Sequence, residues 1–273
     1  MDPAIVDRRT THLPGVDEAG LPVRTMSIAG LEGRLATRVL SKDMSGPATR
    51  IAKFEGSWGS GATGAFTADV SVLVLNGRLR IGAQSIGQYD FAHIPQRCMV
   101  PGIRAEDGTM ALLLTTAPFS YDTTSGGMAG AVEIVRATEI PWEAQPCQEG
   151  RFVKRLASTR QGDSWLSGSV DWSGDDGPWH RHAVAEEMVL LDGELTISEL
   201  DGRGPQTHTY LPGGYVWRPA GILHAGPGSS AEGKAIAFHH TSGVLETEWV
   251  DEQSMPVPST DQGQNEPDSH AES

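Results

Sequence analysis

The chain has 273 residues, 38% of them hydrophobic, with 33 glycines and 17 prolines. Its formal net charge of −14 argues against nucleic acid or an anionic membrane surface as a partner, because either would attract a basic face. This length allows one large domain or two smaller ones. The abundance of turn-forming residues predicts an all-β architecture of short strands rather than a helical bundle.

The N-terminal segment, residues 1–24, contains no apolar run of the kind that a signal peptide needs, and we expect it to be flexible. No apolar run in the chain approaches the length of a membrane span, so no membrane partner is expected. Cys98 and Cys147, the only cysteines, lack metal-ligand spacing and are too few for a disulfide framework. They predict ordinary thiols in a reducing, cytoplasmic compartment.

Two stretches of the chain resemble each other: VLVLNGRLRI at residues 72–81 and MVLLDGELTI at residues 188–197. Each combines an apolar strand, an Asn-Gly or Asp-Gly pair and a second strand. This pattern predicts a hairpin, because a type I′ turn needs positive φ at both central residues. Similar segments also flank the two stretches: RVLSKD before the first resembles RLASTR before the second, and ALLLTT after the first resembles AIAFHH after the second. The sequence therefore predicts a duplicated β module, at residues 25–140 and 151–250, with a linker over residues 141–150.

The second module carries the densest group of candidate metal ligands, in GPWHRHAVAEEMVLLDGEL at residues 177–195. His180 and His182 point the same way if they lie on a strand, because alternate residues share a face. The same alternation favours Glu186 on that face and Glu187 on the other, although an irregular step at the intervening AVA would reverse the two. His224 follows a turn in RPAGILHAGP that can bring a third imidazole back across a barrel. Three imidazoles and one carboxylate suit a divalent ion such as Fe, Zn, Mn, Ni or Cu.

These residues resemble the two motifs of the cupin superfamily. The first, G-x5-H-x-H-x3,4-E-x6-G, is matched by Gly174, His180, His182, Glu186 and Gly193. The second, G-x5-P-x-G-x2-H-x3-N, is matched by Gly213, Pro219, Gly221 and His224, with Gly228 in place of the final Asn. This part of the chain is most similar to the ChrR-like cupins, which include the zinc-binding domain of a bacterial anti-sigma factor and several small metal-dependent dioxygenases.

The resemblance implies a bicupin, an all-β chain of two tandem cupin (jelly-roll) β-barrels. It also implies that the metal ligands are His180, His182, Glu186 and His224, and the motif spacing to Gly193 selects Glu186 over Glu187.

The first module lacks the corresponding side chains. Gly64, Phe66 and Val70 occupy the places of the two motif histidines and the glutamate, and Val100 corresponds loosely to the third histidine. None of these side chains binds a metal ion. The N-terminal barrel is therefore expected to be degenerate and to serve as a packing partner for the C-terminal one.

The resemblance further implies an enzyme with one divalent metal ion per chain, Fe(II) being favoured. Its expected activity is that of a dioxygenase on a small oxygenated substrate that chelates the metal, such as a diketone or a phenolic ketone. Two alternatives stay open: a non-enzymatic zinc-binding sensor or regulatory module, and a metal-dependent isomerase, lyase or decarboxylase. For the oligomeric state, the resemblance allows a homodimer formed through edge strands.

Four other residues of the second module are candidates for the substrate pocket. Alternation in GGYVWRP places Tyr215 and Arg218 on opposite faces of one strand, so either face could line the barrel mouth. His239 and His240 lie on a late strand, and one of them is a candidate for a hydrogen-bond partner of a metal ligand or for a general base.

The C-terminal segment, residues 251–273, is rich in carboxylates, contains no Lys or Arg and has almost nothing apolar to bury. This composition predicts a disordered acidic tail.

Overall fold

The computed structural model describes residues 12–43, 46–124, 127–128, 130–146, 148–175, 177–201 and 204–250. Cys147 and the acidic tail, for which a thiol and disorder were predicted, lie outside these residues. Over the described ranges the chain is nearly all β-strand, as predicted, with a single 3-10 turn at Glu18–Gly20. Within the same ranges, no helix has the length and apolar character needed to cross a membrane.

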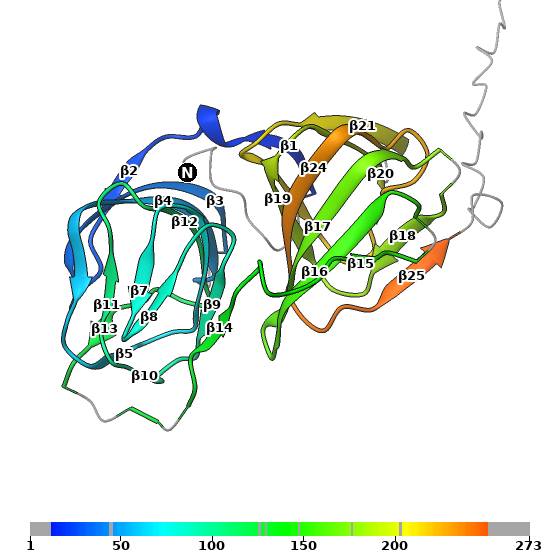
Figure 1. Ribbon diagram of the computed structural model, residues 1–273. Helices are drawn as coiled ribbons and strands as arrows, with labels where there is room; N and C mark the ends of the chain where they lie inside the picture. The colour runs from blue at the N-terminus through cyan, green and yellow to red at the C-terminus, as the bar shows by residue number, and fades with distance from the viewer. Residues whose placement is uncertain are drawn as a thin grey trace, which may run out of the picture.

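A first unit is built from a ten-stranded sheet and a three-stranded sheet that curve around a common interior (Figure 1). Short strands joined by tight turns allow this curvature, because each strand can twist relative to its neighbour. Its strands are β2 (Arg24–Met26), β3 (Glu32–Lys42), β4 (Ala48–Ser60), β5 (Gly64–Phe66), β6 (Val70–Asn76), β7 (Leu79–Ile81), β8 (Gln84–Ile86), β9 (Phe91–Ile94), β10 (Met99–Val100), β11 (Ile103–Ala105), β12 (Met110–Thr115), β13 (Tyr121–Asp122) and β14 (Glu133–Val135).

A second unit is one barrel-like sheet of twelve strands, which lies beside the first (Figure 1). It contains the chain from β15 onward together with the N-terminal strand. Its strands are β1 (Leu13–Asp17), β15 (Glu143–Ala144), β16 (Arg151–Thr159), β17 (Gly162–Ser173), β18 (Trp179–His182), β19 (Glu186–Asp192), β20 (Leu195–Asp201), β21 (Gly204–Tyr210), β22 (Gly214–Arg218), β23 (Leu223–His224), β24 (Ser230–Thr241) and β25 (Thr247–Val250).

The strands of the two units pair in the same order. The first unit contains the run β3–β4–β12–β6–β9, and the second contains β16–β17–β24–β19–β22. The short β5 pairs with β10 and β13, just as β18 pairs with β23 and β25. These runs contain the segments that resemble each other in the sequence.

The predicted hairpins at the Asn-Gly and Asp-Gly pairs are wrong. Gly77 and Gly193 do have positive φ, of 82° and 80°. In the described residues, however, β6 pairs with β9 and β12 rather than β7, and β19 pairs with β22 and β24 rather than β20. Glycine meets the backbone requirement of a sharp reversal whether or not the two flanking strands bond to each other. Here each reversal carries the chain from one set of strand partners to another.

Flexibility was predicted over residues 1–24, and the described part of this segment, from residue 12, contains regular structure. Residues 1–11 lie outside the described residues. Strand β1 pairs with β22 of the second unit, with Leu13 opposite Trp217 and Val16 opposite Tyr215. Leu13 and Val16 pack against a buried cluster, and this apolar contact gives the short segment a reason to order. The predicted linker is also partly regular, because β15 pairs with β16.

The two units share a hydrophobic core formed by their facing sheets. In β6, Val72 and Val74 point into the first unit and Leu73 points toward the second, as strand alternation requires. The rings of Phe91 and Phe238 stack across the boundary with centroids 6.3 Å apart. Buried members of this shared core are Leu40, Ile51, Leu73, Phe91, Leu112, Leu114, Ala137, Leu156, Leu166, Val189, Tyr215, Trp217, Ile236 and Phe238.

Glu187 is a buried carboxylate at this boundary. Thr49 Oγ1 and Tyr215 Oη each donate a hydrogen bond to it at 2.8 Å, and Ser41 Oγ lies 3.5 Å away. Ser41 and Thr49 belong to the first unit, so the carboxylate links the two units. Because neighbouring strand residues face opposite ways, Glu186 points into the interior of the second unit.

Candidate metal centre

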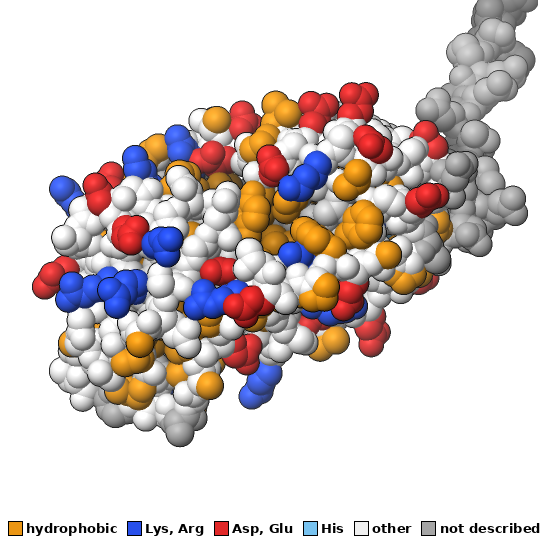
Figure 2. Space-filling model, in the orientation of Figure 1, with side chains coloured by type: hydrophobic (Ala, Val, Ile, Leu, Met, Phe, Trp, Pro, Cys, Tyr) orange, Lys and Arg blue, Asp and Glu red, His pale blue; other side chains and the backbone are white. Residues whose placement is uncertain are grey.

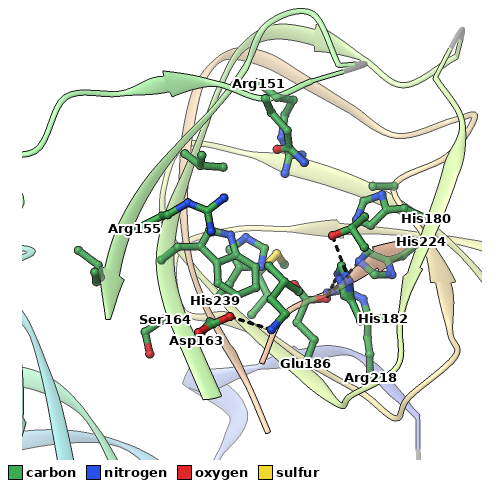
Figure 3. A pocket seen from close by; sticks show the side chains of 18 of the residues that line it. Arg151, Arg155, Asp163, Ser164, His180, His182, Glu186, Arg218, His224 and His239 are labelled. Atoms are coloured by element: carbon green, nitrogen blue, oxygen red, sulfur yellow. Dashed lines mark hydrogen bonds and ion pairs between the residues drawn. The ribbon is translucent and has the colours of Figure 1, made fainter. Parts of the chain in front are cut away.

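Three histidines meet inside the second unit. His180 and His182 lie on the same side of β18, and His180 pairs in register with His224 of β23. One ligand atom from each ring can be chosen so that all three lie within 4.8 Å of one another. All three side chains are buried, and the rings of His180 and His224 are 4.1 Å apart between centroids. The structure therefore brings together the three imidazoles singled out from the sequence (Figure 3).

Backbone carbonyls fix the orientation of two of these rings. His182 Nδ1 lies 3.2 Å from the carbonyl oxygen of Glu246, and His224 Nδ1 lies 3.0 Å from that of Ile222. A carbonyl oxygen only accepts, so each Nδ1 carries a proton, and Nε2 is the nitrogen of each ring that would bind an ion. Hydrogen bonds of this kind orient metal-binding histidines.

Burial favours the neutral, metal-binding form of His180 and His182. Burial, followed by the neighbouring histidines, lowers the pKa of His180 well below its usual value. Burial also lowers the pKa of His182, against the attraction of Glu186. His180 Nδ1 is buried and has no hydrogen-bond partner among the described residues. A neutral ring with an unpartnered nitrogen is a suitable metal donor.

Glu186 faces the histidines, as alternation favoured. Its Oε2 lies 3.1 Å from His224 Nε2, while His239 Nδ1 donates to Oε1 at 2.7 Å. Burial opposes the charged carboxylate, but the cationic Arg218 and the hydrogen bond from His239 hold the pKa of Glu186 well below its usual range. With Nδ1 of His224 protonated, Nε2 and Oε2 are two acceptors at close range, and a cation between them would satisfy both. Donor atoms of one ion with bonds of about 2.0–2.2 Å can lie about 3 Å apart, so this spacing fits a shared metal.

Arg218 connects Glu186 to a second buried carboxylate. Its Nη1 donates to Glu186 Oε2 at 3.1 Å, and its Nε donates to Glu199 Oε1 at 2.5 Å. Despite burial, these carboxylates raise the pKa of Arg218, and the guanidinium together with His12 lowers the pKa of Glu199 to about 2. His12 Nε2 lies 2.8 Å from Glu199 Oε2. A continuous row of charged and polar groups therefore runs from the N-terminal segment to Glu186.

The three histidines border a cavity of about 520 Å³, within the range of small-molecule sites. Hydrophobic side chains gather on the face of the molecule around β16 and β17 (Figure 2). The ring of Trp165 stacks on His239 with centroids 4.9 Å apart and an interplanar angle of 8°. The apolar part of the cavity wall includes Val153, Leu156, Trp165, Leu245 and Trp249.

Two of the four predicted pocket candidates line this cavity and two do not. Arg218 and His239 border it. Tyr215 lies in the shared core, where it donates to Glu187, so it faces away from the histidines. His240 points to the opposite side of β24 from His239, where its Nδ1 lies 3.0 Å from Ser164 Oγ beside a separate cavity of about 250 Å³. Both corrections follow from strand alternation.

Nothing in the sequence singles out Arg151, Arg155 or Glu199. Arg151 and Arg155 line the cavity from β16, and Glu199 pairs with Arg218 from β20. None of them belongs to a motif. The only local signal is a charged residue inside a strand, which does not reveal the face it occupies.

The first unit has matching backbone positions with different side chains. Gly64 of β5 pairs with Val100 of β10, in the same relation as His180 and His224. Over the described ranges, His180, His182 and His224 form the one group of three or more His, Cys, Asp or Glu residues whose ligand atoms lie close enough to share an ion.

Comparison with known proteins identifies the fold. No family model and no curated protein matches the sequence. A "putative dioxygenase" of Nostoc punctiforme is similar in structure, with a TM-score of 0.68 and 16% identity over 83% of this chain and 81% of that one. A deletion mutant of Bacillus subtilis oxalate decarboxylase has a TM-score of 0.62 and 12% identity over 89% and 80%. A further structure of that enzyme, from work on its Mn(II) centres, has a TM-score of 0.60 and 11% identity over 89% and 81%. At these identities the similarity is evidence of fold alone, and it supports the cupin fold.

Proposed function

We propose that the chain is a metal-dependent cupin enzyme whose second unit binds one divalent ion. The observation that carries this proposal is the meeting of three buried imidazoles, from His180, His182 and His224, at the wall of a small-molecule cavity. We infer that the first unit is a cupin barrel without a metal centre and stabilises the second through their shared core, which makes the chain a bicupin.

Glu186 is the proposed fourth ligand. Its Oε2 faces His224 while it also accepts from Arg218, and a carboxylate oxygen has more than one lone pair to offer. The hydrogen bond from His239 to Oε1 holds the carboxylate in this orientation. The stacked ring of Trp165 in turn restricts His239.

The proposed reaction is an Fe(II)-type dioxygenation of a small oxygenated substrate that can chelate the metal, such as a diketone or a phenolic ketone. A bound iron would polarise the oxygen atoms of the substrate and activate O2. His180, His182, Glu186 and His224 would hold the ion in a buried position, and the apolar wall would keep water away from the substrate. The structural similarity to a protein described as a dioxygenase favours this reaction class.

Anaerobic purification followed by metal analysis and oxygen-uptake assays tests the proposal. We expect about one ion per chain, and oxygen consumption with diketone or phenolic ketone substrates after iron loading. His182→Ala should lose the ion. His240→Ala is the matched control, because this histidine faces away from the cavity and its variant should keep the ion. Full metal content in His182→Ala would refute the site.

A metal-dependent decarboxylase is the second candidate, favoured by the similarity to oxalate decarboxylase. Measuring CO2 release and oxygen uptake on the same metal-loaded protein distinguishes the two reactions, because decarboxylation releases CO2 without stoichiometric oxygen uptake. Tightly bound zinc with neither activity after reconstitution with iron, manganese or nickel would instead support the zinc-binding sensor.

A further inference from the structure

Arg151 is a buried cation, and two of its three guanidinium nitrogens have no hydrogen-bond partner among the described residues. Its side chain lines the cavity, and its Nε and Nη1 are buried without a hydrogen-bond partner in the described part of the chain. Arg218, the other buried arginine of this cavity, differs because Glu186 and Glu199 both pair with it. A guanidinium removed from water is costly unless its donors are satisfied. The unsatisfied donors of Arg151 therefore point to a function in binding.

The local structure aims Arg151 at the cavity. The backbone of Arg151 pairs with Ser169 on β17, and its guanidinium lies over the ring of Trp172, 4.4 Å from the centroid. Stacking on one face of the guanidinium leaves its edge free to donate. Figure 3 shows the nitrogen-bearing end of Arg151 directed into the cavity that the histidine group also lines.

Among the described residues, neither acidic side chain that lines the cavity pairs with the guanidinium of Arg151. Glu186 is engaged by Arg218 and His239. Asp163 accepts from the backbone N–H of Leu245 and lies at the far end of the cavity from Arg151 (Figure 3). Burial lowers the pKa of Arg151 to about 10, against the attraction of Glu186, so the side chain stays charged at neutral pH.

We propose that Arg151 binds the carboxylate of an organic acid, whose apolar body lies along the cavity wall toward the three histidines. A carboxylate matches the paired donors of a guanidinium edge and supplies the missing negative charge. The apolar wall of Val153, Leu156 and Trp165 suits a hydrocarbon or aromatic body. The proposal deepens the proposed function by naming the substrate class, and rests on it for the position of the reacting end.

Matched charged and neutral probes test this inference by calorimetry, without any turnover. Benzoate and phenylacetate are compared with benzamide and phenylacetamide on the metal-loaded protein, each up to 10 mM. We expect each carboxylate to bind at least about tenfold more tightly than its amide, as charge-assisted hydrogen bonds allow. Arg151→Met should reduce this ratio to about one, and Arg151→Lys should restore part of it. Arg80→Met is the control, since Arg80 is exposed on β7 of the first unit and does not line the cavity, so its loss should leave the ratio unchanged.

Folding does not confound the test, because Arg151→Met removes a charge without breaking a hydrogen bond of Nε or Nη1. Its thermal midpoint should equal or exceed that of the wild type, while its stabilisation by benzoate disappears. An unchanged ratio in Arg151→Met, or no binding of either carboxylate to the wild type, would overturn the inference. His182→Ala separates it from the proposed metal site. If His182→Ala still prefers the carboxylate over the amide, the preference depends on Arg151. If His182→Ala loses the preference and Arg151→Met keeps it, the preference depends on the metal, and the role of Arg151 is refuted.

Discussion

Removing the hydroxyl of Tyr215 is expected to weaken the contact between the two units without affecting metal binding. Tyr215 Oη donates to the buried carboxylate of Glu187 at 2.8 Å, as does Thr49 Oγ1. A hydrogen bond to a charged group contributes about 1.5–3 kcal/mol, so Tyr215→Phe and Thr49→Val should each lower the free energy of unfolding by about that amount. The double variant removes the two hydroxyl groups that lie 2.8 Å from Glu187, and its cost should exceed the sum of the single costs.

Urea unfolding followed by tryptophan fluorescence measures these costs, and metal analysis of the same samples checks the site. Tyr210→Phe is the matched control: Tyr210 is equally buried, but its hydroxyl accepts only a long 3.4 Å hydrogen bond from the backbone N–H of Gly15 among the bonds described. Tyr215→Phe should be clearly more costly than Tyr210→Phe and should retain the ion. A cost below about 0.5 kcal/mol would show that this buried carboxylate does not depend on its hydroxyl donors. Loss of the ion would return Tyr215 to the candidate site residues.

Three further changes probe other parts of the structure. Arg218→Met leaves Glu186 and Glu199 buried without their cation and should cost about 3–5 kcal/mol in urea unfolding; a neutral effect would mean that the carboxylates find other partners. Phe238→Ala removes a stacked ring from the shared core and should also cost about 3–5 kcal/mol, so an unchanged midpoint would contradict the packing of the two units. Burial lowers the pKa of His93 below its usual value of about 6.5. The unfolded chain therefore takes up a proton that the folded chain resists, and stability falls as the pH decreases below about 6.5. His93→Gln should make this fall shallower between pH 7.5 and 5.5, and an identical slope would show that His93 does not contribute.

Alternation along strands predicted the centre of the site better than its surroundings. The two-residue spacing of His180 and His182, continued to Glu186, placed all three on the inner face, and the motif turn returned His224 to them. The same rule could separate His239 from His240 but could not say which of them faces inward. That choice depends on which sheet packs against the neighbouring unit, and such contacts are formed by residues far apart in the chain.

The partners of each strand were harder to predict than the strands themselves. The Asp-Gly pair marks a real reversal at Gly193, but whether β19 bonds to β20 or to β22 and β24 depends on how the whole sheet closes. The strand β1 was missed because LPGVD has little strand character by itself and is ordered by its pairing with β22. Arg151 was missed for a related reason. It is distinguished by the lack of a hydrogen-bond partner for Nε and Nη1 among the described residues, and no sequence pattern reveals such a lack.

The equivalence of Gly64 with His180 has a consequence for how this chain could change by mutation. A Cβ atom at Gly64 would lie 2.6 Å from the ring of Tyr121 and 2.8 Å from the carbonyl oxygen of Asp122. Tyr121 is itself fixed, because its hydroxyl lies within hydrogen-bond distance of the carbonyl oxygens of Ala62 and Val100. A histidine at this position would therefore have to displace an aromatic ring and a backbone segment before it could reach an ion. Substitution of Gly64 by histidine alone is therefore not expected to create an ion site in the first unit, because the fold around Tyr121 and Asp122 would have to change with it.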